Sequence, residues 1–289
     1  MSFRPSRLAA ASLFLVLGAC ATTAAPPAAE PATTPGMPAA ADMPELRPGF
    51  IAGYLTTAAL PDSLALVPAP PAAGSAALEQ DHAVMRAALA LRGTPRFEQA
   101  RLDADLHFPF AAGTFACALG TDITEQDTPA TWRLLRRSLA DAAASTRKAK
   151  KHYERPRPFV ENAAPTCTPE DEEALRSNGS YPSGHTAIGW MWALVLSQAV
   201  PERTTALLAR GRNFGESRLV CNVHWQSDVL QGRFMAAGTF ARLQSHPEFR
   251  TDMAAATEEL ATRAGRGTVT QRDCAAEAAA LAQPLEGVL

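Results

Sequence analysis

The chain has 289 residues, 47% of them hydrophobic, and a formal net charge of −2, which is the profile of a globular protein with one sizeable domain. Its 27 Lys and Arg residues are balanced by 29 Asp and Glu residues. The basic excess of a nucleic-acid-binding protein is missing, and we expect no nucleic-acid partner.

The first residues have the pattern of an export signal. Arg4 and Arg7 precede an apolar run over 8–19, which is too short to span a bilayer as a helix. The run ends in Leu-Gly-Ala before Cys20, which resembles a bacterial lipobox. We therefore expect residues 1–20 to be a lipoprotein signal peptide, with Cys20 as the lipidated residue.

The alternative is ordinary secretory cleavage near residues 24–25. Ala21, not Asp, follows the cysteine, and by resemblance to sorted lipoproteins this predicts a periplasmic protein anchored to the outer membrane. Residues 21–48 are rich in Ala, Pro and Thr and cannot form a core, so we expect a disordered tether.

Residues 49–250 read as a mainly helical domain, because alternating strand patterns are almost absent and Val and Ile are sparse. Asp127 and Thr128 before Pro129 predict an N-cap and a helix running to Lys150. The fold class expected is all-α, a single helical bundle. Apolar residues at a spacing of three or four predict further helices over 77–91, 97–106, 108–119 and 187–200. Residues 251–289 form a C-terminal helical extension, with helices over 252–264 and 270–282.

Four cysteines follow the signal region: Cys117, Cys167, Cys221 and Cys274. In an oxidising compartment they can form two disulfides, and the sequence leaves all three pairings open. No Cys-x-x-Cys or Cys/His pair has ligand spacing, so we expect no metal site.

The first chemical stretch, over 179–186, reads Gly-Ser-Tyr-Pro-Ser-Gly-His-Thr and leads into an apolar helix. The backbone N–H groups of Ser183 and Gly184 are expected to be uncovered. A helix N-terminus of this kind attracts anions. His185 lies at the same edge, which places a proton donor beside an anion cradle.

The second stretch, over 148–159, is basic and ends in Arg-Pro-Arg-Pro-Phe. A solvated basic face is the ordinary interpretation. However, the prolines stiffen the backbone, and Tyr153 and Phe159 require part of it to be buried. Lys150 and Arg157 are candidates to bind a phosphate, because Arg offers a matching fork and Lys a point charge.

The third stretch contains Arg218, His224 and Asp228. On a helix, His224 and Asp228 would share a face, so the carboxylate would accept a hydrogen bond from one ring nitrogen. The other nitrogen would remain free as a nucleophile. A surface His–Asp pair is the alternative, and the apolar neighbours Val223 and Trp225 argue against it.

Together these stretches resemble the three-part signature of the phosphatidic acid phosphatase type 2 (PAP2) superfamily. The flanks are similar to its class A bacterial non-specific acid phosphatases, over roughly residues 54–249. The matching segments are Lys150-x6-Arg157-Pro158, Pro182-Ser183-Gly184-His185 and Ser217-Arg218-x5-His224-x3-Asp228.

The resemblance implies an all-α enzyme that hydrolyses phosphate monoesters without a metal or cofactor. His224 would attack phosphorus to form a phosphohistidine, His185 would protonate the leaving alcohol and then help activate water, and Asp228 would orient His224. The phosphoryl oxygens would be held by Lys150, Arg157, Arg218, Ser183 and Gly184.

Two points stay open. Lys148-x6-Arg155-Pro156 fits the first motif equally well on spacing, and we prefer Lys150 and Arg157 because Tyr153 and Phe159 then fall in the family's places. The family does not lead us to expect Cys117 and Cys274. Cys167 and Cys221 lie before and within motif segments, where a bond between them would fit.

The functional alternatives are a vanadium-dependent haloperoxidase, a lipid-phosphate phosphatase and a non-catalytic phosphate-binding lipoprotein. For the phosphatase, the expected partners are small phosphate monoesters, a membrane contacted only through the lipid anchor, and further copies of the chain in a homo-oligomer. The remaining histidines lie outside any motif: His82, His107, His152 and His246.

Overall fold

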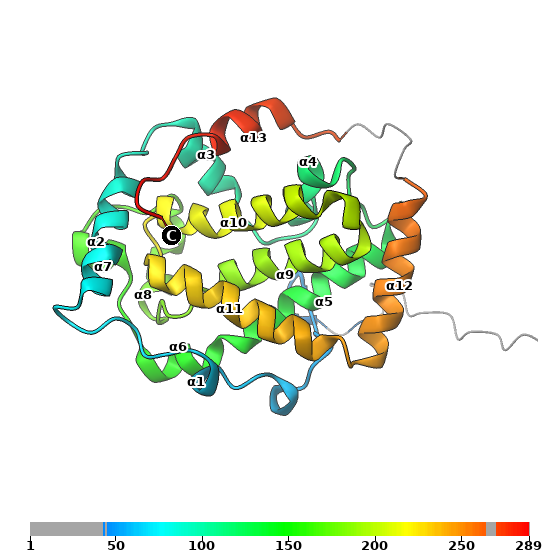
Figure 1. Ribbon diagram of the computed structural model, residues 1–289, viewed down its shortest axis with the longest axis horizontal. Helices are drawn as coiled ribbons and strands as arrows, with labels where there is room; N and C mark the ends of the chain where they lie inside the picture. The colour runs from blue at the N-terminus through cyan, green and yellow to red at the C-terminus, as the bar shows by residue number, and fades with distance from the viewer. Residues whose placement is uncertain (1–42, 44, 264–269, 289) are drawn as a thin grey trace, which may run out of the picture. The chain divides into compact units, whose positions relative to one another are not determined.

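The computed structural model describes residues 43, 45–263 and 270–288. The predicted signal peptide, Cys20 and most of the predicted tether lie outside the described residues. Helices dominate the described part, which confirms the all-α class (Figure 1). Strands β1 (Glu45–Arg47) and β2 (Phe50–Ile51) form a small antiparallel pair that the sequence patterns did not predict.

The centre of the bundle is α9 (Gly184–Ala199), which packs against α5 (Pro129–Ser145), α10 (Thr204–Val220) and α11 (Gln226–Leu243). Figure 1 shows α9, α10 and α11 side by side, with α12 (Pro247–Ala261) crossing at one end. Because α9 is apolar on nearly all sides, it is stable only when surrounded by other helices.

Two glycines allow α9 and α10 to approach closely. A Cβ atom at Gly189 would lie 2.1 Å from Phe214, and one at Gly211 would lie 2.6 Å from the Cβ of Ala193. This approach brings the N-terminus of α9, with its Pro-Ser-Gly-His turn, close to the last turn of α10. Both ends contribute to the site described below.

The predicted helix from Pro129 to Lys150 is interrupted. The helix α5 ends at Ser145, and α6 (Arg147–Tyr153) begins after Thr146. The Oγ of Ser145 donates to the carbonyl of Ala142 at 2.8 Å, and the Oγ1 of Thr146 donates to that of Ala143 at 2.9 Å. Such side-chain bonds compete with the helical ladder.

Thr128 occupies the predicted N-cap position, but its side chain bonds to Thr124 and does not cap α5. The cap comes from another helix. The Glu259 carboxylate on α12 accepts the N–H groups of Ala130 and Thr131 at 2.7 and 2.8 Å. A carboxylate here also interacts favourably with the helix dipole.

The helix α12 runs across the predicted boundary between residues 250 and 251. It buries Phe249, Met253 and Leu260 in the same core as α5 and α9. Its Asp252 also accepts from Arg133 at 2.7 Å. Farther on, α13 (Cys274–Leu281) is bonded to α4 (Ala116–Leu119) through a Cys117–Cys274 disulfide.

The remaining elements are short or lie outside the bundle centre. The predicted 77–91 helix is α2 (Ala76–Leu89), and the 97–106 helix is α3 (Pro95–Leu102). The 108–119 segment forms the 3-10 turn η3 (Phe110–Phe115) followed by α4. The other elements are η2 (Thr57–Ala59), α1 (Ser63–Leu66), α7 (Pro158–Asn162), η4 (Pro169–Asp171), α8 (Glu172–Arg176) and η5 (Pro201–Arg203).

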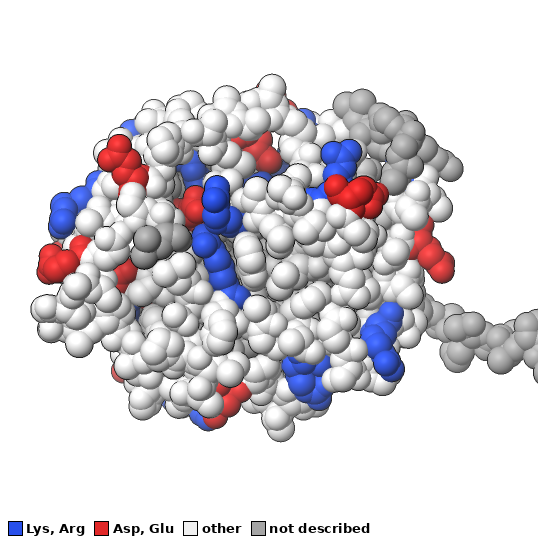
Figure 2. Space-filling model, viewed as in Figure 1, with Lys and Arg blue, Asp and Glu red and all other residues white. Residues whose placement is uncertain are grey.

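Charged side chains of both signs are interspersed on the face shown in Figure 2. This distribution agrees with the nearly balanced composition. Within the described ranges, no helix is long and apolar enough to cross a membrane.

Candidate active site

Backbone and side-chain bonds join the three predicted stretches to one another. The N–H of Ser180 donates to the carbonyl of Arg155 at 2.9 Å, which links the second stretch to the first. The N–H of Ser183 donates to the carbonyl of Asp228 at 2.9 Å, which links the first to the third. These segments are far apart in the sequence and meet where α9 and α11 begin and α10 ends.

The His224 ring is fixed on both sides. Its Nδ1 lies 3.1 Å from the Oδ2 of Asp228, and its Nε2 lies 3.1 Å from the Nη1 of Arg157. An arginine only donates, so Nε2 must be the acceptor and Nδ1 must carry the proton. The lone pair of Nε2 therefore points toward a cation.

The sequence suggested that His224 and Asp228 share one face of a helix, but their contact arises in another way. His224 precedes α11, whose N-cap is Trp225, and Asp228 lies in the first turn. The Asp228 carboxylate reaches back and accepts from the N–H of Trp225 at 2.9 Å as well as from the ring. Asp228 is thus a capping residue and the partner of the histidine.

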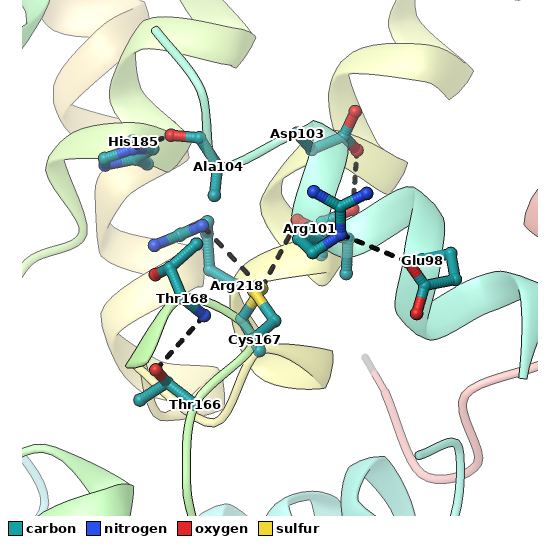
Figure 3. The surroundings of a disulfide bond; sticks show 12 residues. Glu98, Arg101, Asp103, Ala104, Thr166, Cys167, Thr168, His185 and Arg218 are labelled. Atoms are coloured by element: carbon teal, nitrogen blue, oxygen red, sulfur yellow. Dashed lines mark hydrogen bonds and ion pairs between the residues drawn. A yellow bond between two sulfur atoms is a disulfide. The ribbon is translucent and has the colours of Figure 1, made fainter. Parts of the chain in front are cut away.

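His185 has a different partner. Its Nε2 lies 3.1 Å from the carbonyl oxygen of Ala104, which can only accept, so the proton is on Nε2. Figure 3 shows the ring pointing to Ala104, with Arg218 nearby. In the neutral ring, Nδ1 is therefore the unprotonated nitrogen.

Three cations surround the histidines. Arg157 is 4% exposed and donates to the carbonyls of Leu175 and Val223 at 2.9 and 3.0 Å. The Nζ of Lys150 donates to the carbonyls of Gly179 and Ser180 at 2.8 and 3.1 Å.

Arg218 lacks a full set of partners. It is 2% exposed, and its Nε has no hydrogen-bond partner among the described residues. Its Nη1 makes a long contact of 3.9 Å to the Sγ of Cys221. A buried unsatisfied donor on a cation is costly, and a bound anion would satisfy it.

Burial and mutual repulsion perturb these groups. Burial, followed by the charge of Arg157, lowers the pKa of Lys150 to about 7 and that of Arg218 to about 10. Burial lowers the pKa of Arg157 to about 10. A dianion would relieve the repulsion between the cations and raise all three values.

The surroundings of both histidines disfavour the protonated ring. Burial, followed by the charge of Arg157, holds the pKa of His224 well below its usual value. Burial, followed by the charge of Arg218, does the same to the pKa of His185. Strongly shifted groups that converge on a buried cationic site mark a functional site.

Comparisons with known proteins agree with this geometry. The PAP2 superfamily model matches residues 133–249, which include all the site residues described above except Ala104. The chain is 46% identical over 209 residues to a non-specific acid phosphatase of Providencia stuartii, covering 72% of this chain and 84% of that protein. It is 47% identical over 195 residues to a non-specific acid phosphatase of Salmonella typhimurium, covering 67% and 78%. An acid phosphatase of Zymomonas mobilis is 40% identical over 199 residues, covering 69% and 75%.

The chain belongs to the PAP2 superfamily. The resemblance inferred from the sequence motifs is confirmed, and so is the enzyme class, an acid phosphatase or phosphoric monoester hydrolase. The two candidate lysines of the first PAP2 motif lie in different places, while Arg155 of the alternative register also reaches the site through Asp228. Lys150 and Arg157 lie at the site, whereas Lys148 is exposed and pairs with Asp62 at 2.5 Å.

Ser183 of the second PAP2 motif differs in part from expectation. Its backbone N–H is bonded to Asp228, so it is not available to an anion. Its Oγ accepts from the N–H and the Oγ1 of Thr186 at 3.2 and 2.9 Å, so the hydroxyl proton remains to be donated. Gly184 is the first residue of α9, where a backbone N–H has no partner within the helix.

The cysteines form two disulfides, Cys117–Cys274 and Cys167–Cys221. The second pair is the one expected to fit the motif segments. Cys221 is the C-cap of α10, between Arg218 and His224, and Cys167 lies on the segment before η4 (Figure 3). This disulfide therefore ties the loop of the PAP2 nucleophile candidate to a second segment.

Several residues that support the PAP2 site were not predicted in that role, although Arg155 was considered as the alternative register of the first motif. Arg155 pairs with Asp228 at 2.8 Å and with Asp81 of α2 at 2.8 Å. The doubled Arg-Pro was a visible signal for Arg155, but nothing in the sequence indicated Asp81 or the carbonyl of Ala104. Both come from segments distant in the chain.

Proposed function

We propose that this acid phosphatase hydrolyses small phosphate monoesters in two steps, through a phosphohistidine on His224 and without a metal ion. The observation that carries the proposal is the tautomer of His224. Its Nδ1–H faces the Asp228 carboxylate, and its Nε2 lone pair faces Arg157, where a phosphoryl group would lie. A histidine held in this way is an activated nucleophile.

In the first step, Nε2 attacks phosphorus and the bond from phosphorus to the ester oxygen breaks. His185, as the imidazolium, donates its Nδ1 proton to the leaving alcohol. Arg157, Lys150 and Arg218 stabilise the charge that spreads over the phosphoryl oxygens, with the Ser183 hydroxyl and the N–H of Gly184. Asp228 balances the positive charge that develops on His224.

In the second step, water attacks phosphorus and the N–P bond breaks. Neutral His185 accepts a proton from the water, which restores the imidazolium for the next cycle. Burial and the charge of Arg218 depress the pKa of His185. A bound phosphate dianion opposes that effect and favours the protonated ring when it is needed.

The test is hydrolysis of p-nitrophenyl phosphate at mildly acidic pH in the presence of a metal chelator. We expect full activity with the chelator and competitive inhibition by vanadate. Activity that requires added metal would contradict the proposal. Vanadate-dependent oxidation of bromide by peroxide would favour the haloperoxidase alternative, and binding of phosphate without turnover would favour the binding lipoprotein.

We also propose that the chain is exported and anchored to the outer membrane through Cys20. The export pattern over residues 1–20 supports this, and so do two disulfides, which persist in oxidising compartments. A Cys20→Ala variant should move from the membrane fraction to the soluble periplasmic fraction, with its kcat unchanged. A mature wild-type protein whose N-terminal residue carries no acyl group by mass spectrometry would contradict the anchor.

A further inference from the structure

Behind the Asp228 carboxylate lies a buried network that the two proposed steps do not use. The Nη1 of Arg155 donates to the Oδ1 of Asp228 at 2.8 Å, and its Nη2 donates to the Oδ2 of Asp81 at 2.8 Å. The side chains of Arg155, Asp81 and Asp228 are 9%, 2% and 0% exposed. One guanidinium therefore joins two buried carboxylates from different parts of the chain.

Ser227 closes this network into a ring. Its Oγ accepts from Arg155 at 2.7 Å and donates to the Oδ2 of Asp81 at 2.6 Å, while its backbone N–H donates to the Oδ1 of Asp81 at 2.8 Å. The Arg155 guanidinium also lies 5.3 Å from the Trp225 ring centroid. Together these contacts fix the guanidinium of Arg155 in one orientation.

That orientation determines which oxygen of Asp228 faces the site histidine. Arg155 occupies Oδ1, so Oδ2 is left to accept from the ring of His224 and the N–H of Trp225. Without Arg155, the carboxylate could rotate and share its oxygens among fewer donors. A fixed carboxylate fixes the ring plane and the direction of its Nε2 lone pair.

The charges of this network also favour the nucleophilic role of His224. Asp81, Arg155 and Asp228 together carry one net negative charge, and it faces an imidazole that becomes positive when His224 is phosphorylated. Burial raises the pKa of Asp228, whereas the charges of Arg155 and Lys150 and the N–H of Trp225 lower it. Arg155 thus helps to keep Asp228 ionised where burial would protonate it.

We infer that Arg155, locked in place by Asp81 and Ser227, is a positioning residue that sets the orientation and charge of Asp228 and through it the reactivity of His224. This inference rests on the proposed function, in which His224 is the nucleophile. It gives Asp81 on α2 a role that the three motifs do not contain. The terminal nitrogens of Arg155 are bonded to Asp81, Ser227 and Asp228.

The experiment compares Arg155→Lys and Arg155→Gln with Arg137→Lys as a matched control. Arg137 is also a buried arginine with two carboxylate partners, Glu248 and Asp252, but it lies on α5 outside the site. Arg155→Lys keeps the positive charge but loses the two terminal nitrogens that bond to Asp228 and Asp81. We expect its kcat to fall about 10- to 100-fold with KM nearly unchanged, which is the range seen when a residue that orients a metal-binding histidine is replaced.

Arg155→Gln also removes the charge. The groups facing Asp228 are then His224, Lys150, Arg157, Tyr181, the hydroxyl of Ser180 and the N–H of Trp225, and loss of the Arg155 charge raises the pKa of Asp228. The acid limb of the kcat/KM profile should therefore move to higher pH in Arg155→Gln and stay in place in Arg155→Lys. The downfield proton resonance of His224 Nδ1–H should broaden or shift in both variants and remain in the control.

If Arg155→Gln does not fold, Ser227→Ala tests the same ring, because it removes both hydrogen bonds of the Ser227 hydroxyl, to Arg155 and to Asp81, and should lower kcat about five- to thirtyfold. The inference is overturned if the Arg155 variants lose only thermal stability, as the control does, while kcat, the acid limb and the Nδ1–H resonance stay at wild-type values. Failure of the proposed function would look different. In that case the wild-type enzyme would form no phosphohistidine, even if the Nδ1–H resonance of His224 changed in the Arg155 variants as expected.

Discussion

The two histidines of the site are held by partners of different charge. The Nδ1–H of His224 bonds to a buried carboxylate, Asp228, which a second carboxylate supports through Arg155. The Nε2–H of His185 bonds to a neutral backbone carbonyl, that of Ala104. A carboxylate stands next to Ala104 in the sequence, but the oxygens of Asp103 accept from Arg210 and Ser217 and not from the ring.

This difference separates two chemical roles. A carboxylate stabilises an imidazolium and suits a ring that carries positive charge throughout the life of an N–P bond. A carbonyl orients a ring but stabilises its charge less, which suits a group that gains and loses a proton in each cycle. On the proposed mechanism, this difference in partners distinguishes the nucleophile from the proton shuttle, although both are histidines in one cationic pocket.

The largest effect should come from His224→Ala. Loss of an activated nucleophile lowers kcat by about 10⁴- to 10⁶-fold, because no other group in the pocket replaces it. The measurement is steady-state hydrolysis of p-nitrophenyl phosphate. His152→Ala is the matched control, because His152 is exposed on α6, and it should retain wild-type turnover. A His224→Ala enzyme within tenfold of wild type would contradict the assignment.

His185→Asn should have a smaller effect that depends on the leaving group. Proton donation contributes about 10²- to 10⁴-fold when the leaving group is a poor one such as an alkoxide. p-Nitrophenolate is stable without a proton and should be lost with a much smaller penalty. Equal losses for alkyl and p-nitrophenyl phosphates would show that His185 is not the acid, whereas the His224→Ala loss should be independent of the leaving group.

Some of this site is visible in the sequence because its parts are local. Ser183, Gly184 and His185 are adjacent, and His224 and Asp228 are four residues apart, so each group is detectable within one turn of chain. The helices were predictable for the same reason, since apolar residues at a spacing of three or four reveal one buried face.

The rest depends on partners that are distant in the chain. The Glu259 carboxylate that caps α5 is about 130 residues away from the helix start in the sequence. Asp81, which holds Arg155 in place, is 74 residues away from it. No local pattern encodes such pairs. The break after Ser145 was also missed, because it follows from how two hydroxyl side chains bond in the folded helix.

Lys150→Arg tests the role of the cations that surround the two histidines. Lys150 is charged below its pKa of about 7 and neutral above it, so substrate binding should weaken as pH rises through that value. An arginine stays charged there, and the basic limb of kcat/KM should move to higher pH. Ratios of variant to wild type at each pH cancel the ionisation of the substrate. An unmoved basic limb would show that Lys150 does not control it.

Removing one or the other of the two disulfides should give the smallest difference in kcat among these tests. On the chain-entropy model, the Cys117–Cys274 loop stabilises by about 5 kcal/mol and the shorter Cys167–Cys221 loop by about 4 kcal/mol. Only the second bond ties the His224 loop. Replacing both Cys167 and Cys221 by Ser should lower kcat on the order of tenfold, as expected when a reacting group is loosened.

Replacing Cys117 and Cys274 by Ser is the matched control. It should lower the melting temperature at least as much and leave kcat at a temperature well below melting within about twofold of wild type. If both double variants lose activity equally, the Cys167–Cys221 bond has no special link to the nucleophile loop.

The most direct test of the account is to identify the covalent intermediate. The enzyme is mixed with a phosphate monoester labelled on phosphorus, quenched in base within milliseconds, digested and mapped by mass spectrometry. The account predicts a labelled phosphohistidine at His224 that is absent in His224→Ala and persists longer in His185→Asn. Rapid turnover of substrate with label on another residue, or on none, would contradict it.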